Sequence, residues 1–225
     1  MRRILIAAAL IAVTAAATAY VASTRSPQER HQAGSVRGSQ LKRLKVPKIG
    51  EPPPSLEGRI PISEAQLREA EAAGLVDRPI KTILDVPQRM SYGDYVWNDR
   101  GVPEGPVWIR VDLSSQLLSV FRSGHEIGTA VILYGADGLP TPTGKFPILA
   151  KWKDHKSATY GDAPMPYTLR LTNDGVSIHG SNVRWGFATH GCVGIPKAFA
   201  AKVFEVVSKG DEVLIVPEKS KGRTA

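Results

Sequence analysis

Apolar and polar residues alternate along three segments in the middle of the chain. These segments read "VWIRVDL" from Val107, "QLLSVFR" from Gln116 and "HEIGTAVILYG" from His125, and they are rich in β-branched residues. The pair Ser123-Gly124, between the second and third segments, is typical of a tight turn. Three strands joined in succession by short connections predict an antiparallel meander.

The rest of the chain after this meander predicts further strands and one helix. The segments "MPYTLRL" and "GVSIHG" flank Asn173-Asp174-Gly175, which favours a hairpin turn. Pro196 opens "KAFAAKVFEVVSKG", in which Phe199 and Val203 recur at helical spacing, and "DEVLIV" predicts a last strand. No helix is predicted between the earlier strands, which argues against a doubly wound sheet. The pattern predicts a mainly β domain over roughly residues 90–217, with one late α-helix packed on it.

A short helix is predicted ahead of this domain. Ser63-Glu64-Ala65-Gln66 has the form of a capping box, and "EAQLREAEAAG" is rich in helix formers and ends at Gly74. The sequence therefore divides into an accessory helix and lead-in at residues 61–106, the β domain at 107–217 and a C-terminal tail at 218–225.

The N-terminus has the pattern of an export segment. Arg2 and Arg3 precede an apolar run from Ile4 to Ala22, and Ala17-Thr18-Ala19 offers a small-residue cleavage pattern. The run approaches the length that spans a bilayer but is mostly alanine, so residues 1–22 are either a cleaved signal peptide or an N-terminal anchor in the inner membrane. Both outcomes place the rest of the chain in the periplasm or cell envelope.

The net charge of +8 is concentrated in a segment that follows the export segment. Residues 1–60 hold 10 Lys and Arg against three acids, which leaves 19 against 18 in residues 61–225. The nearly neutral domain carries no basic face for nucleic acid, so no nucleic-acid partner is expected. Residues 23–60 are polar and contain Pro and Gly, which predicts a basic flexible linker. The linker is interpreted as a spacer, and the alternative is adhesion to an anionic membrane or wall surface.

Cys192 is the only cysteine of the chain and stands in "ATHGCVGIP". A single thiol in an exported protein is a buried apolar residue, a partner in an intermolecular disulfide or a reactive nucleophile. A cysteine nucleophile needs a base, because the thiolate is the attacking species. His179, at the end of a predicted strand, can approach the sulfur from a neighbouring strand, which makes it a better-placed base than His190.

The same residues are compatible with a metal site. Cys192, His179 and His190 could bind Zn²⁺, with His155 as an optional fourth ligand. The sequence has no Cys-x-x-Cys or His-x-x-x-His pair to support that alternative, so a nucleophile and base are favoured. We expect neither a metal nor another cofactor.

These residues resemble the catalytic domain of the L,D-transpeptidases, also called the YkuD family. "IHG" and "THGCVGIP", preceded by "VDLSSQLLSVFRSG", "TPTGKFPI" and "MPYTLRL", follow the order of that family over residues 107–216. The resemblance implies a mainly β sandwich that acts on peptidoglycan stem peptides. In the family, cysteine attacks the carbonyl of the third, diamino-acid residue of a stem tetrapeptide and releases D-alanine. An amine on a neighbouring stem then resolves the thioester, which cross-links the cell wall.

The resemblance also implies roles for individual residues. Cys192 is the nucleophile, His179 is the base, and the carbonyl of Gly180 orients the imidazole. The backbone amides of His190, Gly191 and Cys192 form the oxyanion hole.

A tyrosine hydroxyl serves the oxyanion in some members of the family. Tyr160 and Tyr167 are the candidates here, and Tyr160 is favoured, although both residues also suit a packing role. Gly194 stands where an arginine or asparagine is common, and the spacer before Thr189 is short. Arg184 in that spacer is expected to replace the missing substrate contact.

The sequence leaves two other functions open. An L,D-carboxypeptidase of the same fold would use water to resolve the thioester, and both enzymes share the first half-reaction. An inactive wall-binding module on a basic tether is the other alternative, against which the Cys192 and His179 pair argues.

Overall fold

The computed structural model describes residues 56–136 and 138–218. These residues lie within one compact unit, Pro52–Ala225. The predicted export segment, most of the predicted linker and residues 219–225 lie outside the described residues. Within the described ranges, no helix is long and apolar enough to cross a membrane.

Within the part of the chain that the structure describes, eight strands form the larger of two sheets. Its order is β1-β2-β6-β5-β4-β12-β7, and β3 also pairs with β6, on the edge opposite β5. The strands are β1 (Arg59–Pro61), β2 (Thr82–Leu84), β3 (Tyr95–Trp97), β4 (Val107–Asp112), β5 (Leu117–Arg122), β6 (His125–Val131), β7 (Gly144–Pro147) and β12 (Glu212–Val216). Strands β4, β5 and β6 pair antiparallel in succession, so the predicted meander is confirmed.

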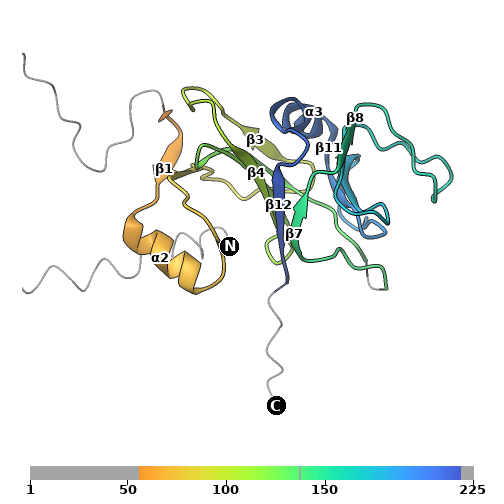
Figure 1. The fold of residues 1–225 in the computed structure, drawn as a ribbon, viewed down its shortest axis with the longest axis horizontal. Helices are drawn as coiled ribbons and strands as arrows, with labels where there is room; N and C mark the ends of the chain where they lie inside the picture. Colours follow the sequence, from red (N-terminus) through yellow and green to blue (C-terminus); the bar gives the residue numbers. More distant parts are fainter. Residues whose placement is uncertain (1–55, 137, 219–225) are drawn as a thin grey trace, which may run out of the picture. The chain divides into compact units, whose positions relative to one another are not determined.

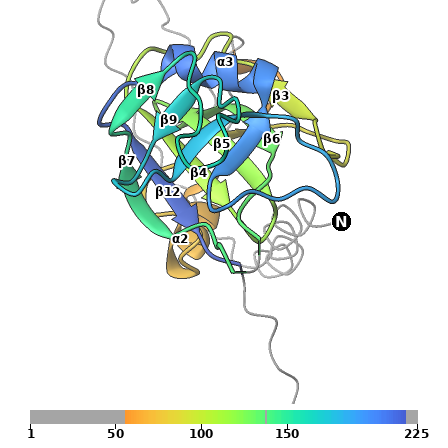
Figure 2. The same ribbon diagram turned by 90° about the vertical axis from the view of Figure 1, so that its right-hand side faces the viewer.

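The smaller sheet has four strands in the order β11-β10-β9-β8. Its strands are β8 (Ala150–Trp152), β9 (Thr168–Arg170), β10 (Ser177–Ser181) and β11 (Val193–Pro196), and the two helices of the described residues are α2 (Glu64–Ala72) and α3 (Lys197–Val206). Figure 2 shows β8 and β9 in front of the strands of the larger sheet, with α3 along one edge. The mainly β fold with a late helix is therefore confirmed. The hairpin turn between β9 and β10 and the capping box of Ser63 are confirmed as well.

The main hydrophobic core joins both sheets and α3. Ile109 and Val120, paired across β4 and β5, belong to it together with Ile178 of β10 and Phe199 of α3. Gly128 of β6 lets the helix approach closely, because a Cβ there would lie 2.4 Å from the Trp97 ring and 2.9 Å from the Phe199 ring. Those two rings meet edge to face with centroids 5.7 Å apart. The position of α3 thus depends on glycine, which has no side chain, at position 128 of the sheet.

The lead-in segment covers the outer face of the larger sheet. Figure 1 shows α2 on the side of that sheet away from β8 and β11. Trp108 and Phe121 stack at 4.4 Å between ring centroids and bury Ile80 of the lead-in in a second hydrophobic cluster. The strands of the meander are therefore buried on both faces, although their sequence alternates.

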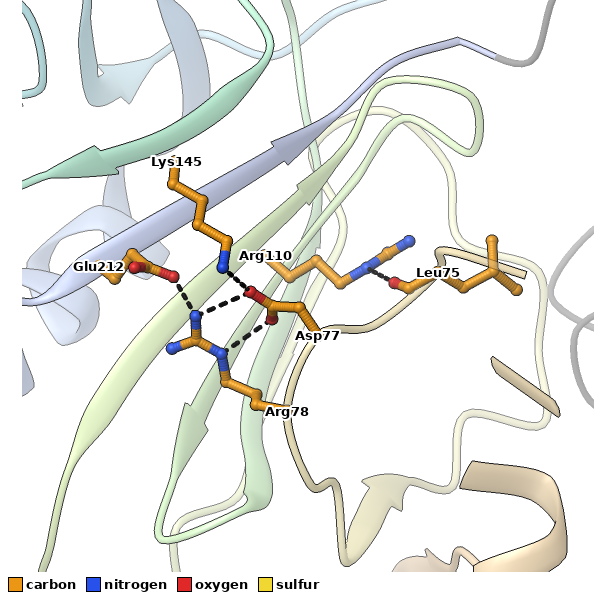
Figure 3. A network of polar contacts seen from close by, with 6 residues as sticks. All are labelled: Leu75, Asp77, Arg78, Arg110, Lys145 and Glu212. Carbon is orange, nitrogen blue, oxygen red and sulfur yellow. Dashed lines mark hydrogen bonds and ion pairs between the residues drawn. The ribbon is translucent and has the colours of Figure 1, made fainter. Parts of the chain in front are cut away.

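Charged residues connect the lead-in to the edge of the larger sheet (Figure 3). The Arg78 guanidinium donates to the Asp77 carboxylate at 2.9 and 3.1 Å and also to Glu212 of β12. Lys145 of β7 pairs with Asp77, and Arg110 of β4 donates through Nε to the carbonyl of Leu75 at 2.9 Å. These contacts hold the pKa of Asp77 well below its usual range, chiefly through the hydrogen bonds from Arg78.

The predicted end of the linker needs correction. The predicted linker extended to residue 60, but Leu56 and Arg59 are buried and β1 pairs with β2. The strands β1, β2 and β3 of the predicted lead-in pair into the same sheet as the meander. Three-residue strands carry too few positions for a periodic pattern, which is why the sequence did not reveal this.

Candidate active site

Two parallel strands bring Cys192 and His179 to one edge of the smaller sheet. Strands β10 and β11 pair in the register Ile178 with Val193 and His179 with Gly194. Ile178 and Val193 are fully buried, so His179 and Gly194 belong to the opposite face. Cys192 comes two residues before Gly194, so its side chain belongs to the same face as His179, diagonally across the strand pair.

The imidazole of His179 is held by the backbone of its own strand. Nδ1 lies 3.1 Å from the carbonyl oxygen of Gly180, to which it donates when Nδ1 carries the proton. This tautomer leaves Nε2 free to accept a proton. Burial lowers the pKa of His179, the hydrogen bond to Gly180 opposes that change, and nearby His155 lowers the pKa further. The resting imidazole is therefore neutral.

The thiol of Cys192 is half-buried beside the β9–β10 turn. Its Sγ lies 4.0 Å from the carbonyl oxygen of Gly175. Burial raises the pKa of the thiol, a hydrogen bond from the backbone of Ser177 opposes that rise, and the carboxylate of Asp174 adds to it. The thiol is therefore neutral at rest, and proton transfer to a base must accompany attack.

Residues 133–136, which follow β6, are hydrogen-bonded to both ends of residues 189–194, the loop that carries Cys192. We call residues 189–194 the cysteine loop and residues 133–136 the clamp. Leu133 and Gly194 exchange backbone hydrogen bonds of 2.8 and 2.9 Å. At the other end, the Thr189 amide donates to the carbonyl of Tyr134 at 3.0 Å, and the Ala136 amide donates to the carbonyl of Thr189 at 3.1 Å. The Thr189 hydroxyl also donates to the carbonyl of Cys192. These bonds hold the loop on each side of the sulfur.

The clamp requires a glycine at position 135, between its two ends. A Cβ on Gly135 would lie 2.1 Å from the carbonyl oxygen of Leu139 and 2.7 Å from the amide of Thr141. The Gly135 amide donates to the Thr141 hydroxyl at 2.9 Å, which fixes this close approach. Gly191 has a φ of +103°, which a residue with a side chain rarely adopts, so the turn into Cys192 also depends on glycine.

The backbone amides of His190 and Gly191 have no acceptor among the described residues. Two such N–H groups just before a nucleophile have the composition of an oxyanion hole, which stabilises negative charge on a substrate carbonyl oxygen.

The model of the L,D-transpeptidase catalytic domain family, named YkuD, matches residues 106–215. Cys192, His179 and the clamp segment all lie inside this range. Residues 106–215 belong to the L,D-transpeptidase catalytic domain family.

Solved structures of L,D-transpeptidases are similar to this chain at low sequence identity. The L,D-transpeptidase (Yku) from Stackebrandtia nassauensis is 25% identical over 52% of this chain and 58% of its own, with a TM-score of 0.47. A mutant of the Enterococcus faecium enzyme is 26% identical over 50% of both chains, with a TM-score of 0.46. The Mycobacterium smegmatis enzyme is 24% identical over 49% and 58%, with a TM-score of 0.45. The similarity spans little more than half of those chains. No curated protein sequence gives a significant match.

The two candidate tyrosines of this transpeptidase domain lie in different surroundings. The exposed ring of Tyr160 stacks on His190, with centroids 4.2 Å apart. Tyr167 is partly buried and packs edge to face on Phe204 of α3, with centroids 5.8 Å apart. The geometry thus places Tyr160 beside the cysteine loop and gives Tyr167 a packing contact.

Gly194, which departs from the family pattern, is enclosed in the transpeptidase domain. A Cβ at this position would lie 3.0 Å from the Cβ of Ser181 and 3.5 Å from that of Leu133. A longer side chain would therefore have to displace a neighbour. Arg184, the suggested replacement contact, is exposed and donates to the side chain of Asn182 at 3.1 Å.

The spacer between His179 and Cys192 displays two aromatic side chains that the sequence did not single out. Trp185 is 82% exposed and Phe187 is 64% exposed. Their signal in the sequence is an apolar pair in a short loop rich in polar and small residues, "SNVRWGFATHG".

The residues of the alternative zinc site have other contacts. His155 stacks on Trp152 with centroids 4.8 Å apart, and His190 stacks on Tyr160. Across residues 56–136 and 138–218, no three His, Cys, Asp or Glu side chains are grouped so that they could hold a metal ion.

Proposed function

We propose that this protein is an exported peptidoglycan L,D-transpeptidase with Cys192 as its nucleophile. The observation that supports the proposal is the β10–β11 register in a domain of this family, from which we infer that Cys192 and His179 share one face. The family acts on peptidoglycan peptides, and the predicted export segment would deliver the enzyme to that substrate.

The proposed first half-reaction forms a thioester. As Sγ of Cys192 attacks the carbonyl carbon of the third residue of a stem tetrapeptide, Nε2 of His179 takes the thiol proton. The carbonyl electron pair moves to oxygen, where the amides of His190 and Gly191 donate to it. The C–N bond to the terminal D-alanine then breaks, and His179 returns the proton to the leaving amine.

The second half-reaction transfers the acyl group to an amine of a neighbouring stem. The amine nitrogen attacks the thioester carbon, His179 accepts the proton that the amine loses, and the C–S bond breaks. The proton then returns to Cys192. If water takes the place of the amine, the product is a shortened tripeptide, and the enzyme is an L,D-carboxypeptidase.

The decisive experiment is mass spectrometry of the full-length protein incubated with muropeptide tetrapeptides. The proposal expects cross-linked dimers and free D-alanine, and it expects neither product from Cys192→Ala. Tripeptide without dimers would indicate the carboxypeptidase, whereas unchanged substrate would favour the wall-binding module. Dimers formed by Cys192→Ala would refute the proposed nucleophile.

A further inference from the structure

A hairpin between β8 and β9 projects beside the cysteine loop. Its arms are bridged at Lys156 and Pro164, and the Ser157 amide donates to the carbonyl of Ala163 at 3.0 Å. At its tip, the Tyr160 amide donates to the Ser157 hydroxyl at 3.0 Å, and the Ala163 amide donates to the carbonyl of Tyr160 at 3.1 Å. These bonds fix the backbone on both sides of the Tyr160 side chain.

The base of the hairpin is equally well held. The Met165 amide donates to the carbonyl of His155, and the Tyr167 amide donates to the carbonyl of Lys153, both at 2.8 Å. The ring of Trp152 stacks on His155. A hairpin fixed at its base and its tip can hold a side chain at a defined position.

The Tyr160 ring meets the cysteine loop at His190. The two rings are nearly parallel, with an interplanar angle of 21°. Tyr160 is nevertheless 45% exposed, so the contact adds little to the hydrophobic core. The stacking contact acts locally, because it holds the His190 side chain of the cysteine loop.

The part of the loop that His190 occupies has few other restraints. Thr189 is clamped by the segment after β6, and Val193 begins β11. Between them, the amides of His190 and Gly191 bond to no described residue, and Gly191 has a left-handed backbone. The Thr189 hydroxyl, which donates to the carbonyl of Cys192, closes the turn around these residues, and the contact of the His190 side chain with Tyr160 adds a second restraint on the orientation of the two amides.

We propose that the ring of Tyr160 is a positioning element of the oxyanion hole. By stacking on His190, the ring orients the amides of His190 and Gly191 toward the oxygen on which negative charge develops. The tyrosine hydroxyl is not required for this role. The inference rests on the proposed function, since it assumes that these amides serve acyl transfer to Cys192.

The test compares three replacements of Tyr160 in the full-length protein. Members of the L,D-transpeptidase family are acylated by carbapenems, so the acylation of Cys192 by a carbapenem is followed by mass spectrometry, and turnover is measured on the tetrapeptide. Tyr160→Phe keeps the flat ring and should acylate at the wild-type rate. Tyr160→Ala removes the ring, and Tyr160→Leu keeps apolar bulk without a flat face. Both should slow acylation about 2- to 12-fold, the range that an aromatic stacking contact is worth.

Two further measurements separate positioning from a structural effect. Because an oxyanion hole acts in the transition state, kcat should fall more than KM rises. His190→Ala should cause a similar loss, and the double variant Tyr160→Ala with His190→Ala should lose no more than either single variant. The thermal midpoints of the three Tyr160 variants should agree.

The possible outcomes are distinct. If Tyr160→Phe is as slow as Tyr160→Ala, the hydroxyl itself serves the oxyanion, and the inference is wrong. A wild-type rate for Tyr160→Ala, or additive losses in the double variant, would also overturn it. If the wild-type protein is not acylated at all, the proposed function fails. Amide NMR relaxation then tests separately whether the Tyr160 ring restrains the cysteine loop through His190. Tyr160→Ala, but not Tyr160→Phe, should then mobilise the amides of His190 and Gly191, and equal order in both variants would refute the contact.

Discussion

Replacing Gly135 with alanine tests whether the segment after β6 positions the nucleophile. The added methyl carbon would lie 2.1 Å from the carbonyl oxygen of Leu139, 2.7 Å from the amide nitrogen of Thr141 and 2.9 Å from the carbonyl carbon of Pro140. All three are backbone atoms, so the strain cannot be relieved by rotating a side chain. The backbone around residue 135 must move, and it pairs with Thr189 of the cysteine loop.

The expected cost follows from the geometry. Overpacking typically costs about 1–3 kcal/mol, and a clash with backbone places Gly135→Ala near about 3 kcal/mol. For a domain of this size, the thermal midpoint should fall by about 6–12 °C. A shift of Thr189 also moves Cys192, and a misplacement of about 1 Å can slow a reaction about 10²-fold.

Gly128→Ala provides the matched control for this variant. Its methyl carbon would clash with Trp97 and Phe199 in the core, away from the clamp. Both variants should lose stability in urea titrations, but only Gly135→Ala should also show slow carbapenem acylation per folded molecule. If folded Gly135→Ala is acylated at the wild-type rate, the clamp does not position the nucleophile, and the reasoning is refuted.

Three further predictions concern the base, the lead-in and the linker. His179→Ala should slow acylation about 10²–10⁴-fold in rapid-mixing measurements, far more than His190→Ala, and equal losses would contradict the assignment of the base. Asp77→Asn should lower the free energy of unfolding at pH 7 by about 1–2 kcal/mol. Because the folded-state pKa of Asp77 is depressed, this difference should shrink as the pH falls below about 4, as urea titrations across pH will show. A protein beginning at Pro52 should be soluble and acylate like the full chain. Salt-sensitive co-sedimentation with sacculi or vesicles that disappears without residues 23–51 would show that the linker also binds a surface.

The sequence predicted the elements whose side chains repeat regularly. The meander, the hairpin turn at Asn173-Asp174-Gly175 and α3 each span enough residues for a periodic or turn signal. The strands of the lead-in are too short for such a signal. The lead-in buries Trp108 through contacts between residues far apart in the chain, which a local pattern does not reveal. The clamp could not be predicted for a similar reason, because it consists of backbone hydrogen bonds between Leu133–Ala136 and the cysteine loop, which place no demand on side-chain type except at Gly135.

The neutral state of the site would protect the single thiol of the exported enzyme that we propose. Oxidation and disulfide exchange act on the thiolate, and burial of Cys192 raises the pKa of its thiol, so little thiolate is present at rest. Burial lowers the pKa of His179 in the same site, so the imidazole is neutral and able to accept a proton. A preformed ion pair would have the opposite pKa shifts and a permanently reactive sulfur. In the enzyme that we propose, the thiolate forms only as Cys192 attacks a bound substrate and His179 takes its proton, which restricts the reactivity of the sulfur to the reaction itself.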